Sequence, residues 1–302
     1  MTRYWPLLLL LAAIWGASYL FIKLAIDDIE PAPMMAFRAL VAGFMLLAYL
    51  AVTRGGRQAV RDLQRSWRPA VVLGALNAAL PYWLVAWGEK YIDSSVAGIA
   101  QSTVPIFTFL LAMRFLPYEH VGRTRVAGVA VGFVGVAVLA GFHPGSGWWA
   151  VAGTLAVVLS SFLYASGGVY GQLRVRTVPG PVLATGSMLA GGLILLPAAV
   201  LQPPAGMPDA EAILGLLALT ILGTAFAQLI LFRVLRLYGS RRLSLVTYLI
   251  PAFAVFYGSV FLDEPVTVAA LGGLALILAG VALASGAQLL GSRRAAAQEE
   301  AA

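Results

Sequence analysis

The stretch "AGIAQSTVPIFTFLLAM", residues 97–113, is apolar enough to cross a membrane, yet polar side chains and a proline lie near its middle. Gln101, Ser102 and Thr103 precede Pro105, which has no backbone N–H to donate. Lipid offers such groups no partner, so a membrane span tolerates them only against protein or a water-filled cavity. The stretch therefore predicts a span that faces the inside of a helical bundle.

Composition places the whole chain in a membrane. Hydrophobic residues make up 61% of the 302 residues, charged residues make up 11%, and the mean hydropathy is +0.88. Soluble globular domains are far less apolar. Runs of about 20 apolar residues, the length that crosses a hydrocarbon core, recur along the chain. We predict an all-α membrane protein with ten transmembrane helices, at 5–24, 34–52, 69–88, 95–113, 123–141, 149–170, 181–201, 212–232, 243–262 and 268–288.

The distribution of basic residues indicates the orientation. With ten spans, 17 of the 20 Lys and Arg residues fall in loops or termini on one side of the membrane. Lys23 and Lys90 fall on the other side, and Arg38 lies within the second span. By the positive-inside rule, both termini are cytoplasmic. The net charge of +7 is therefore explained by topology, and we expect no nucleic-acid partner.

Two parts of the sequence resemble each other. "PIFTFLLAMRFL" (105–116) aligns with "PAFAVFYGSVFL" (251–262), and "AGVAVGFVGVAVLAG" (127–141) aligns with "GGLALILAGVALASG" (272–286). Together with a match further upstream, these alignments keep one order along the chain, at offsets of 145 to 148 residues. Three matches in order indicate an internal repeat.

The repeat predicts the domain organisation. We expect a first five-helix repeat at 1–145, a second at 146–290, and a disordered cytoplasmic tail at 291–302. Because five is odd, the second repeat is inverted in the membrane, which is an architecture of secondary transporters. Pro105 and Pro251 occupy corresponding places, and interrupted helices in corresponding places point to a central site. Both prolines are therefore predicted helix breaks.

Several of these features together resemble a known superfamily. They are ten spans in two halves, a proline in the fourth and ninth spans followed by Glu119 and Glu264, and "IWGASYLFIK" (14–23) in the first span. Over residues 5–288 the chain resembles the drug/metabolite transporter superfamily, specifically its EamA-type exporters. In general likeness it is similar to bacterial exporters of aromatic and other neutral amino acids. The resemblance implies a multi-pass protein of the bacterial inner (plasma) membrane, with a basket of helices around a central cavity and the fifth and tenth helices packed apart from the moving ones.

Charge within the spans narrows the substrate class. All 13 acidic residues lie in loops or near the ends of predicted spans, so a lipophilic cation finds no carboxylate at mid-membrane. Away from the last three residues at each end of a predicted span, Arg38 is the one basic residue, which disfavours phosphorylated solutes. A neutral or zwitterionic solute remains, held by hydroxyls, amides and aromatic rings. We expect export of such metabolites, chiefly amino acids, by alternating access.

Candidate substrate-binding residues are the amides, hydroxyls and aromatic rings near mid-membrane. Amides are costly in lipid and therefore favour a cavity. Hydroxyls also bond their own helix backbone, and aromatic residues also pack in cores or at membrane interfaces. The candidates are Trp15, Asn77, Tyr82, Gln101, Tyr164, Gln228, Ser244 and Tyr248.

Arg38, Glu119 and Glu264 are assigned gating or structural roles. Arg38 is expected to pair with Glu89 or Asp93 at the outer mouth, with binding of a substrate carboxylate as the alternative. Glu119 and Glu264 precede the fifth and tenth spans, where a carboxylate suits the positive end of a helix; a gate is the alternative. The expected pathway contains no obvious protonatable group, which favours facilitated export over proton coupling.

Other functional classes were weighed against transport. The chain has no cysteine, no HExxH motif and no serine–histidine pair at depth, so an enzyme is not expected. We expect no metal and no cofactor, and we expect a monomer that contacts a small-molecule substrate and the lipid bilayer. Transport of other small metabolites or drugs, a channel and a lipid flippase remain as alternatives. Saturable flux would distinguish a transporter from a channel, and dependence on the lipid headgroup would identify a flippase.

Overall fold

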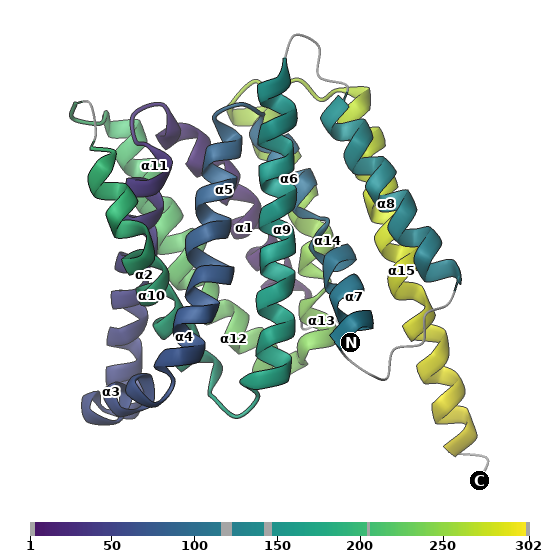
Figure 1. The fold of residues 1–302 in the computed structure, drawn as a ribbon, viewed down its shortest axis with the longest axis horizontal. Helices are drawn as coiled ribbons and strands as arrows, with labels where there is room; N and C mark the ends of the chain where they lie inside the picture. The colour runs from purple at the N-terminus through teal and green to yellow at the C-terminus, as the bar shows by residue number, and fades with distance from the viewer. Residues whose placement is uncertain (1–3, 116–122, 142–146, 204–205, 300–302) are drawn as a thin grey trace.

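The computed structural model describes residues 4–115, 123–141, 147–203 and 206–299, and these residues contain helices and no strand (Figure 1). Seven helices of this described part are long and apolar enough to cross a membrane. Three shorter apolar helices, Val126–Ala140, Val246–Phe261 and Val268–Ala284, lie at the remaining predicted spans. The all-helical, multi-span fold expected from the sequence is therefore confirmed.

The described part of the first half contains α1 (Trp5–Ile26), α2 (Pro31–Arg54), α3 (Gly56–Arg65), α4 (Trp67–Gly74), the π-helix η1 (Ala75–Ala79), α5 (Leu80–Glu89), α6 (Ser94–Gln101), α7 (Val104–Phe115) and α8 (Arg123–Gly141). The described part of the second half contains α9 (Trp148–Arg174), α10 (Gly180–Leu201), α11 (Ala210–Thr220), the π-helix η2 (Ile221–Phe226), α12 (Ala227–Tyr238), α13 (Ser240–Leu243), α14 (Val246–Phe261) and α15 (Val268–Glu299). Proline occupies one of the first two positions of α1, α2 and α10, where its missing N–H breaks no helical hydrogen bond.

The two halves share one hydrophobic core. Ile22 and Met34 from the first half are buried in the same cluster as Leu219 and Ile277 from the second. Helix α1 packs against α14 and α11, and α2 packs along α10, so helices of different halves are neighbours. The space between the halves is therefore enclosed by both.

Three of the predicted spans are interrupted. The third contains η1, the eighth contains η2, and the fourth is divided between α6 and α7. π-Helical turns disturb the regular i to i−4 hydrogen bonding and often lie at functional sites. Segment η1 begins at Ala75 and η2 at Ile221, a separation of 146 residues that lies within the offset range of the sequence repeat. The same irregularity thus occurs at corresponding places in the two halves.

The two predicted proline breaks have different outcomes. Pro105 is the second residue of α7, directly after the interruption at residues 102–103. Pro251 instead lies inside α14, which continues through it, so the break expected there is corrected. A proline inside a helix removes the hydrogen bond to the carbonyl four residues earlier, here that of Thr247. Thr247 and Pro251 both line a cavity, where a freed carbonyl is tolerated.

Helices α8 and α15 form a close pair at one side of the molecule (Figure 1). A Cβ added at Gly280 of α15 would lie 2.5 Å from the carbonyl oxygen of Gly128 in α8. A Cβ added at Gly135 of α8 would lie 2.9 Å from the carbonyl oxygen of Gly273 in α15. Glycine therefore allows the two backbones to touch. The resemblance implies that these two helices pack apart from the moving ones, and in the structure they pack mainly against each other.

The backbone of α15 is helical as far as Glu299, so it includes most of the segment expected as a tail. Sequence analysis predicts that residues 291–302 are disordered. The disorder of this tail stays a prediction.

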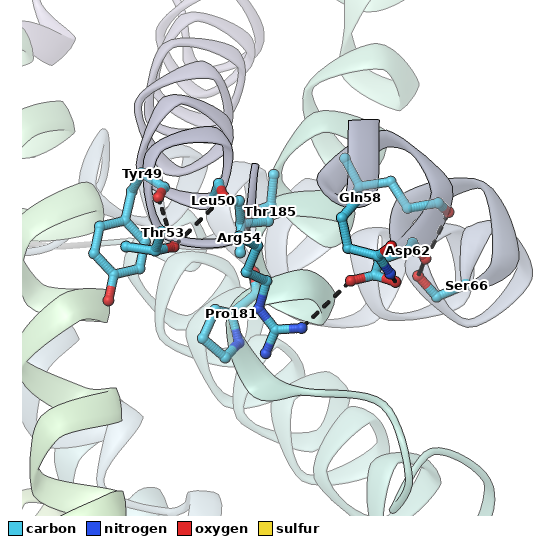
Figure 2. Close-up of polar contacts among 10 residues, drawn as sticks. Tyr49, Leu50, Thr53, Arg54, Gln58, Asp62, Ser66, Pro181 and Thr185 are labelled. Atoms are coloured by element: carbon cyan, nitrogen blue, oxygen red, sulfur yellow. Dashed lines mark hydrogen bonds and ion pairs between the residues drawn. The ribbon is translucent and has the colours of Figure 1, made fainter. Parts of the chain in front are cut away.

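A short helix, α3, follows α2 at one end of the bundle (Figure 1). Gly55, with φ of +83°, makes the turn between the two helices, in a conformation that glycine adopts readily. Asp62 of α3 accepts a hydrogen bond from Gln58 at 2.7 Å and forms an ion pair of 3.3 Å with Arg54 (Figure 2). The Ser66 hydroxyl donates to the Asp62 carbonyl oxygen at 2.7 Å. These polar groups partner one another, which indicates a structural role.

Candidate functional site

A cavity of about 460 Å³ lies between the two halves. Its walls come from α1, α2, the α4–η1–α5 segment, α6, α7, α9, α10, η2, α12 and α14. Another hollow, of about 240 Å³ between α2 and the η2–α12 segment, is lined by Met45, Leu46 and other apolar residues. Of these two cavities, the larger one therefore has the polar side chains in its lining.

The irregular helical segments bring polar groups to this cavity. Asn77 belongs to η1, Thr224 belongs to η2, and Gln101 and Ser102 lie where α6 ends before α7. All four residues line the cavity. Irregular backbone in a membrane protein requires protein or water around it, and a polar cavity between the halves meets that requirement.

Gln101 connects the α6–α7 interruption to α9. Its Nε2 donates a hydrogen bond to the Ser161 hydroxyl at 3.1 Å, and its Oε1 accepts one from the Ser160 hydroxyl at 2.8 Å. The Ser161 hydroxyl in turn reaches the Gln101 carbonyl oxygen at 3.4 Å. Gln101 therefore lines the cavity and also fixes the end of α6 to the second half.

Asn77 packs against a glycine of α9. A Cβ added at Gly167 would lie 2.6 Å from the Asn77 Cγ, so a larger residue at 167 would displace the amide from its present position. The Asn77 Oδ1 atom is buried and has no hydrogen-bond partner within the described part of the chain. Its position depends on packing against α9.

Arg38 lies in the cavity wall and is 7% exposed. Its Nε donates to the Thr224 hydroxyl oxygen at 2.8 Å, and its Nη1 contacts the Met35 sulfur at 3.7 Å. The guanidinium carbon lies 3.9 Å from the centroid of the Tyr82 ring, within cation–π range. Thr224, which was not among the predicted candidates, thus holds Arg38 across the interface between the halves.

The expected ion pair of Arg38 with Glu89 or Asp93 is not formed. In the residues that the structure describes, the ion pairs are Arg54–Asp62 and Lys90–Glu30. Arg38 extends towards η2, where the Thr224 hydroxyl accepts its hydrogen bond. The correction arises because the partner comes from the other half of the molecule.

Charged and polar groups pack beyond one end of the cavity. Lys23 follows the cavity-lining Ile22, and its Nζ donates to the carbonyl oxygens of Glu89 at 2.7 Å and Ile92 at 3.0 Å. The Glu89 side chain is fully buried, and neither carboxylate oxygen has a hydrogen-bond partner among the described residues. The α1–α2 and α5–α6 connections, next to which these residues lie in the sequence, are at the end of the bundle opposite the two termini (Figure 1).

Glu264 caps a different helix from the one expected. Its two carboxylate oxygens accept hydrogen bonds from the backbone N–H groups of Ser94 at 2.6 Å and Ser95 at 2.9 Å, at the start of α6. The start of α15 is capped instead by Thr267, whose hydroxyl oxygen accepts from Ala270 N at 3.0 Å. The predicted capping chemistry is present, but the loop before α15 places Glu264 against the first half.

The structure brings together most of the predicted site residues. The candidates that line the cavity are Trp15, Asn77, Tyr82, Gln101, Tyr164 and Gln228, together with Pro251 and Arg38. Ser244 is exposed between α13 and α14, and Tyr248 packs against the hydrophobic core, so neither belongs to the cavity lining. Glu119 lies outside the described residues. Within the described residues, no cluster of three His, Cys, Asp or Glu side chains could hold a metal ion.

Membrane-spanning helices in two halves, around a mostly apolar cavity that carries a few polar groups, are an arrangement found in membrane transporters. The sequence model of the EamA-like transporter family matches residues 3–141 and again residues 151–286. The chain therefore belongs to the EamA-like transporter family.

Relatives along most of the chain are also transporters. An uncharacterized transporter of Archaeoglobus fulgidus is 25% identical over 287 residues, which are 92% of this chain and 97% of that protein. The uncharacterized inner membrane transporter YedA of Escherichia coli K12 is 26% identical over 251 residues, covering 82% and 78% of the two chains. The uncharacterized transporter YdfC of Bacillus subtilis is 27% identical over 276 residues, covering 89% and 86%.

One crystal structure shares the fold, with a TM-score of 0.67, 22% identity, and coverage of 97% of this chain and 99% of that chain. Family and relatives together assign a transport role in a membrane, as expected from the sequence. They describe transporters and not enzymes.

Proposed function

We propose that this protein is a secondary transporter that exports small neutral or zwitterionic metabolites, chiefly amino acids, across the inner membrane by alternating access. The observation that carries the proposal is the cavity between the halves, with its aromatic rings, amides and hydroxyls. Ligand sites are typically apolar pockets with a few converging polar groups. This cavity has that composition.

The charge of the cavity lining supports this substrate class. Among the described residues, no carboxylate lines the cavity, which disfavours cationic drugs. Arg38 is the single described basic residue in the lining, and one cation is too few for a phosphorylated solute. Trp15, Tyr82 and Tyr164 offer aromatic faces to an apolar part of the substrate.

The arrangement of the halves supports alternating access. The family model matches the chain twice, which favours repeats at 1–145 and 146–290. Interrupted helices at corresponding places are a feature of inverted-repeat transporters with a central site. We infer that the end of the bundle near Lys23 and Glu89 faces the periplasm, because the excess of basic residues favours a cytoplasmic location for the termini.

Counterflow in liposomes tests the proposal. Purified protein would be reconstituted with an internal neutral amino acid, and uptake of radiolabelled L-phenylalanine, L-leucine and L-threonine would be measured with and without a pH gradient. Saturable uptake that does not depend on the gradient is expected, and protein-free liposomes give the background. Failure to take up any neutral amino acid would refute the substrate assignment, and stimulation by the gradient would refute facilitated export.

A further inference from the structure

Arg38 is a buried cation that forms no ion pair with a carboxylate among the residues that the structure describes. It is 7% exposed and takes part in neither of the ion pairs found within the described residues. Glu264 already accepts hydrogen bonds from the backbone of Ser94 and Ser95, and Glu89 acts on Arg38 only over a distance longer than an ion pair. A buried charge without a close counter-ion is unfavourable unless another group supplies one.

The hydrogen bonds around Arg38 fix its guanidinium group. The Thr224 hydroxyl donates its own proton to the Leu219 carbonyl oxygen at 3.0 Å, five residues earlier in the η2 region. Its oxygen is therefore oriented to accept the hydrogen bond from Arg38 Nε, at 2.8 Å. The Tyr82 ring covers one face of the guanidinium at 3.9 Å. The irregular helix and the aromatic ring together hold the planar group in one orientation.

Several donors of Arg38 are available to a ligand. A guanidinium carries five N–H donors, and the described contacts use Nε towards Thr224 and Nη1 towards the weakly accepting Met35 sulfur. Arg38 lines the cavity, so an anion in the cavity can reach the remaining donors. Arginine binds a carboxylate through two parallel hydrogen bonds, which gives both strength and orientation.

We propose that Arg38 binds the carboxylate of the transported solute. The substrate class is then a small monocarboxylate with an apolar or aromatic body, which includes neutral amino acids. This inference rests on the proposed function, because it takes the cavity as the substrate site. Trp15, Tyr164 and Leu231 line the same cavity and would pack against the body of the solute.

A binding experiment with three matched probes tests the proposal without relying on transport. Phenylacetate, phenethylamine and benzyl alcohol carry the same ring with an anionic, a cationic and a neutral group. Their binding to the detergent-purified protein would be measured by isothermal titration calorimetry. Phenylacetate is expected to bind at least about tenfold more tightly than the other two, because only it can form charge-assisted hydrogen bonds with a guanidinium.

Variants of Arg38 and Thr224 test whether the preference for phenylacetate depends on the guanidinium group. Arg38→Gln is expected to lose this preference, and Arg38→Lys is expected to keep only part of it, because an ammonium has no planar fork. Arg38→Gln should remain folded, because the substitution removes an uncompensated buried charge. Thr224→Val keeps the charge but removes the acceptor that orients it, and it should weaken phenylacetate binding several-fold. Thr224→Val carries the test if Arg38→Gln does not fold.

The outcomes separate this inference from the proposed function. Absence of phenylacetate binding to the wild type, equal binding of the three probes, or undiminished binding in folded Arg38→Gln would each overturn it. If Arg38→Gln cannot be purified, undiminished binding in Thr224→Val would overturn it. Counterflow of L-phenylalanine that is unchanged by Arg38→Gln would also overturn it while supporting amino-acid transport. Phenylacetate binding through Arg38 without counterflow of any amino acid would support the anion site and refute the amino-acid substrate.

Discussion

The α8–α15 pair and the helices around the cavity differ in the regularity of their backbones and in how closely they pack. In the pair, Gly128 and Gly280 let two helix backbones touch. Around the cavity, α6 stops before α7, and η1 and η2 interrupt the helical hydrogen bonding; residues of these segments, such as Asn77 and Thr224, line the cavity. Regular backbone packing excludes ligands, whereas irregular backbone creates a site. The comparison indicates a scaffold on one side and a binding region on the other.

The largest expected effect comes from breaking the scaffold. Gly280→Leu would force α8 and α15 apart, because even a Cβ at 280 would lie 2.5 Å from the Gly128 carbonyl oxygen and from Gly132 N. Overpacking of a tight contact is expected to cost about 3 kcal/mol of stability. The measurement is the thermal unfolding temperature by circular dichroism. Gly272→Ala, in the same helix with nothing within 4 Å of the added Cβ, is the control, and equal stability of the two variants would contradict the scaffold role.

A smaller effect is expected where the second half caps a cavity helix. Glu264→Ala would leave the backbone N–H groups of Ser94 and Ser95 without their described acceptor, in buried surroundings. Loss of a side chain that caps a helix start costs about 0.5–2 kcal/mol. Thermal unfolding should show a clear loss of stability, and hydrogen exchange should increase at the start of α6. A variant as stable as the wild type would show that water replaces the carboxylate.

A substitution in the cavity lining should lower the rate of counterflow more than it lowers the stability of the protein. Gln101→Ala would remove the hydrogen bonds to Ser160 and Ser161 that fix the end of α6. We expect initial counterflow rates of the substrate to fall by about tenfold, which corresponds to 1.4 kcal/mol, while expression is maintained. Gln58→Ala, on the peripheral helix α3, is the matched control. Wild-type flux in Gln101→Ala would remove Gln101 from the site.

The smallest effect is expected from breaking an exposed ion pair. Lys90 and Glu30 form an ion pair of 2.8 Å, with side chains that are 31% and 45% exposed. Exposed pairs contribute less than about 1 kcal/mol. Glu30→Gln should therefore leave the unfolding temperature and the counterflow rate close to those of the wild type. A strong decrease in flux would reveal that the pair belongs to a gate.

The cavity lining could be predicted only in part. Amides and aromatic residues near mid-membrane were sound indicators, since Asn77, Gln101 and Tyr82 line the cavity. The hydroxyl of Ser244 was a poor indicator, because a hydroxyl is tolerated at a helix end as readily as in a cavity. The π-helical segments have no recognised signal in the sequence, although their separation matches the offset of the repeat.

The sequence by itself determined the membrane setting, the helical fold and the approximate spans. It could do so because the thickness of a bilayer imposes a length and a composition on every span. The tertiary structure decided which groups the charged side chains contact. Thr224 lies 186 residues from Arg38, and Ser94 lies 170 residues from Glu264, yet each pair forms a hydrogen bond. Such contacts depend on how the two halves pack, and hydrophobic patterns specify which segments are buried but not which side chains become neighbours.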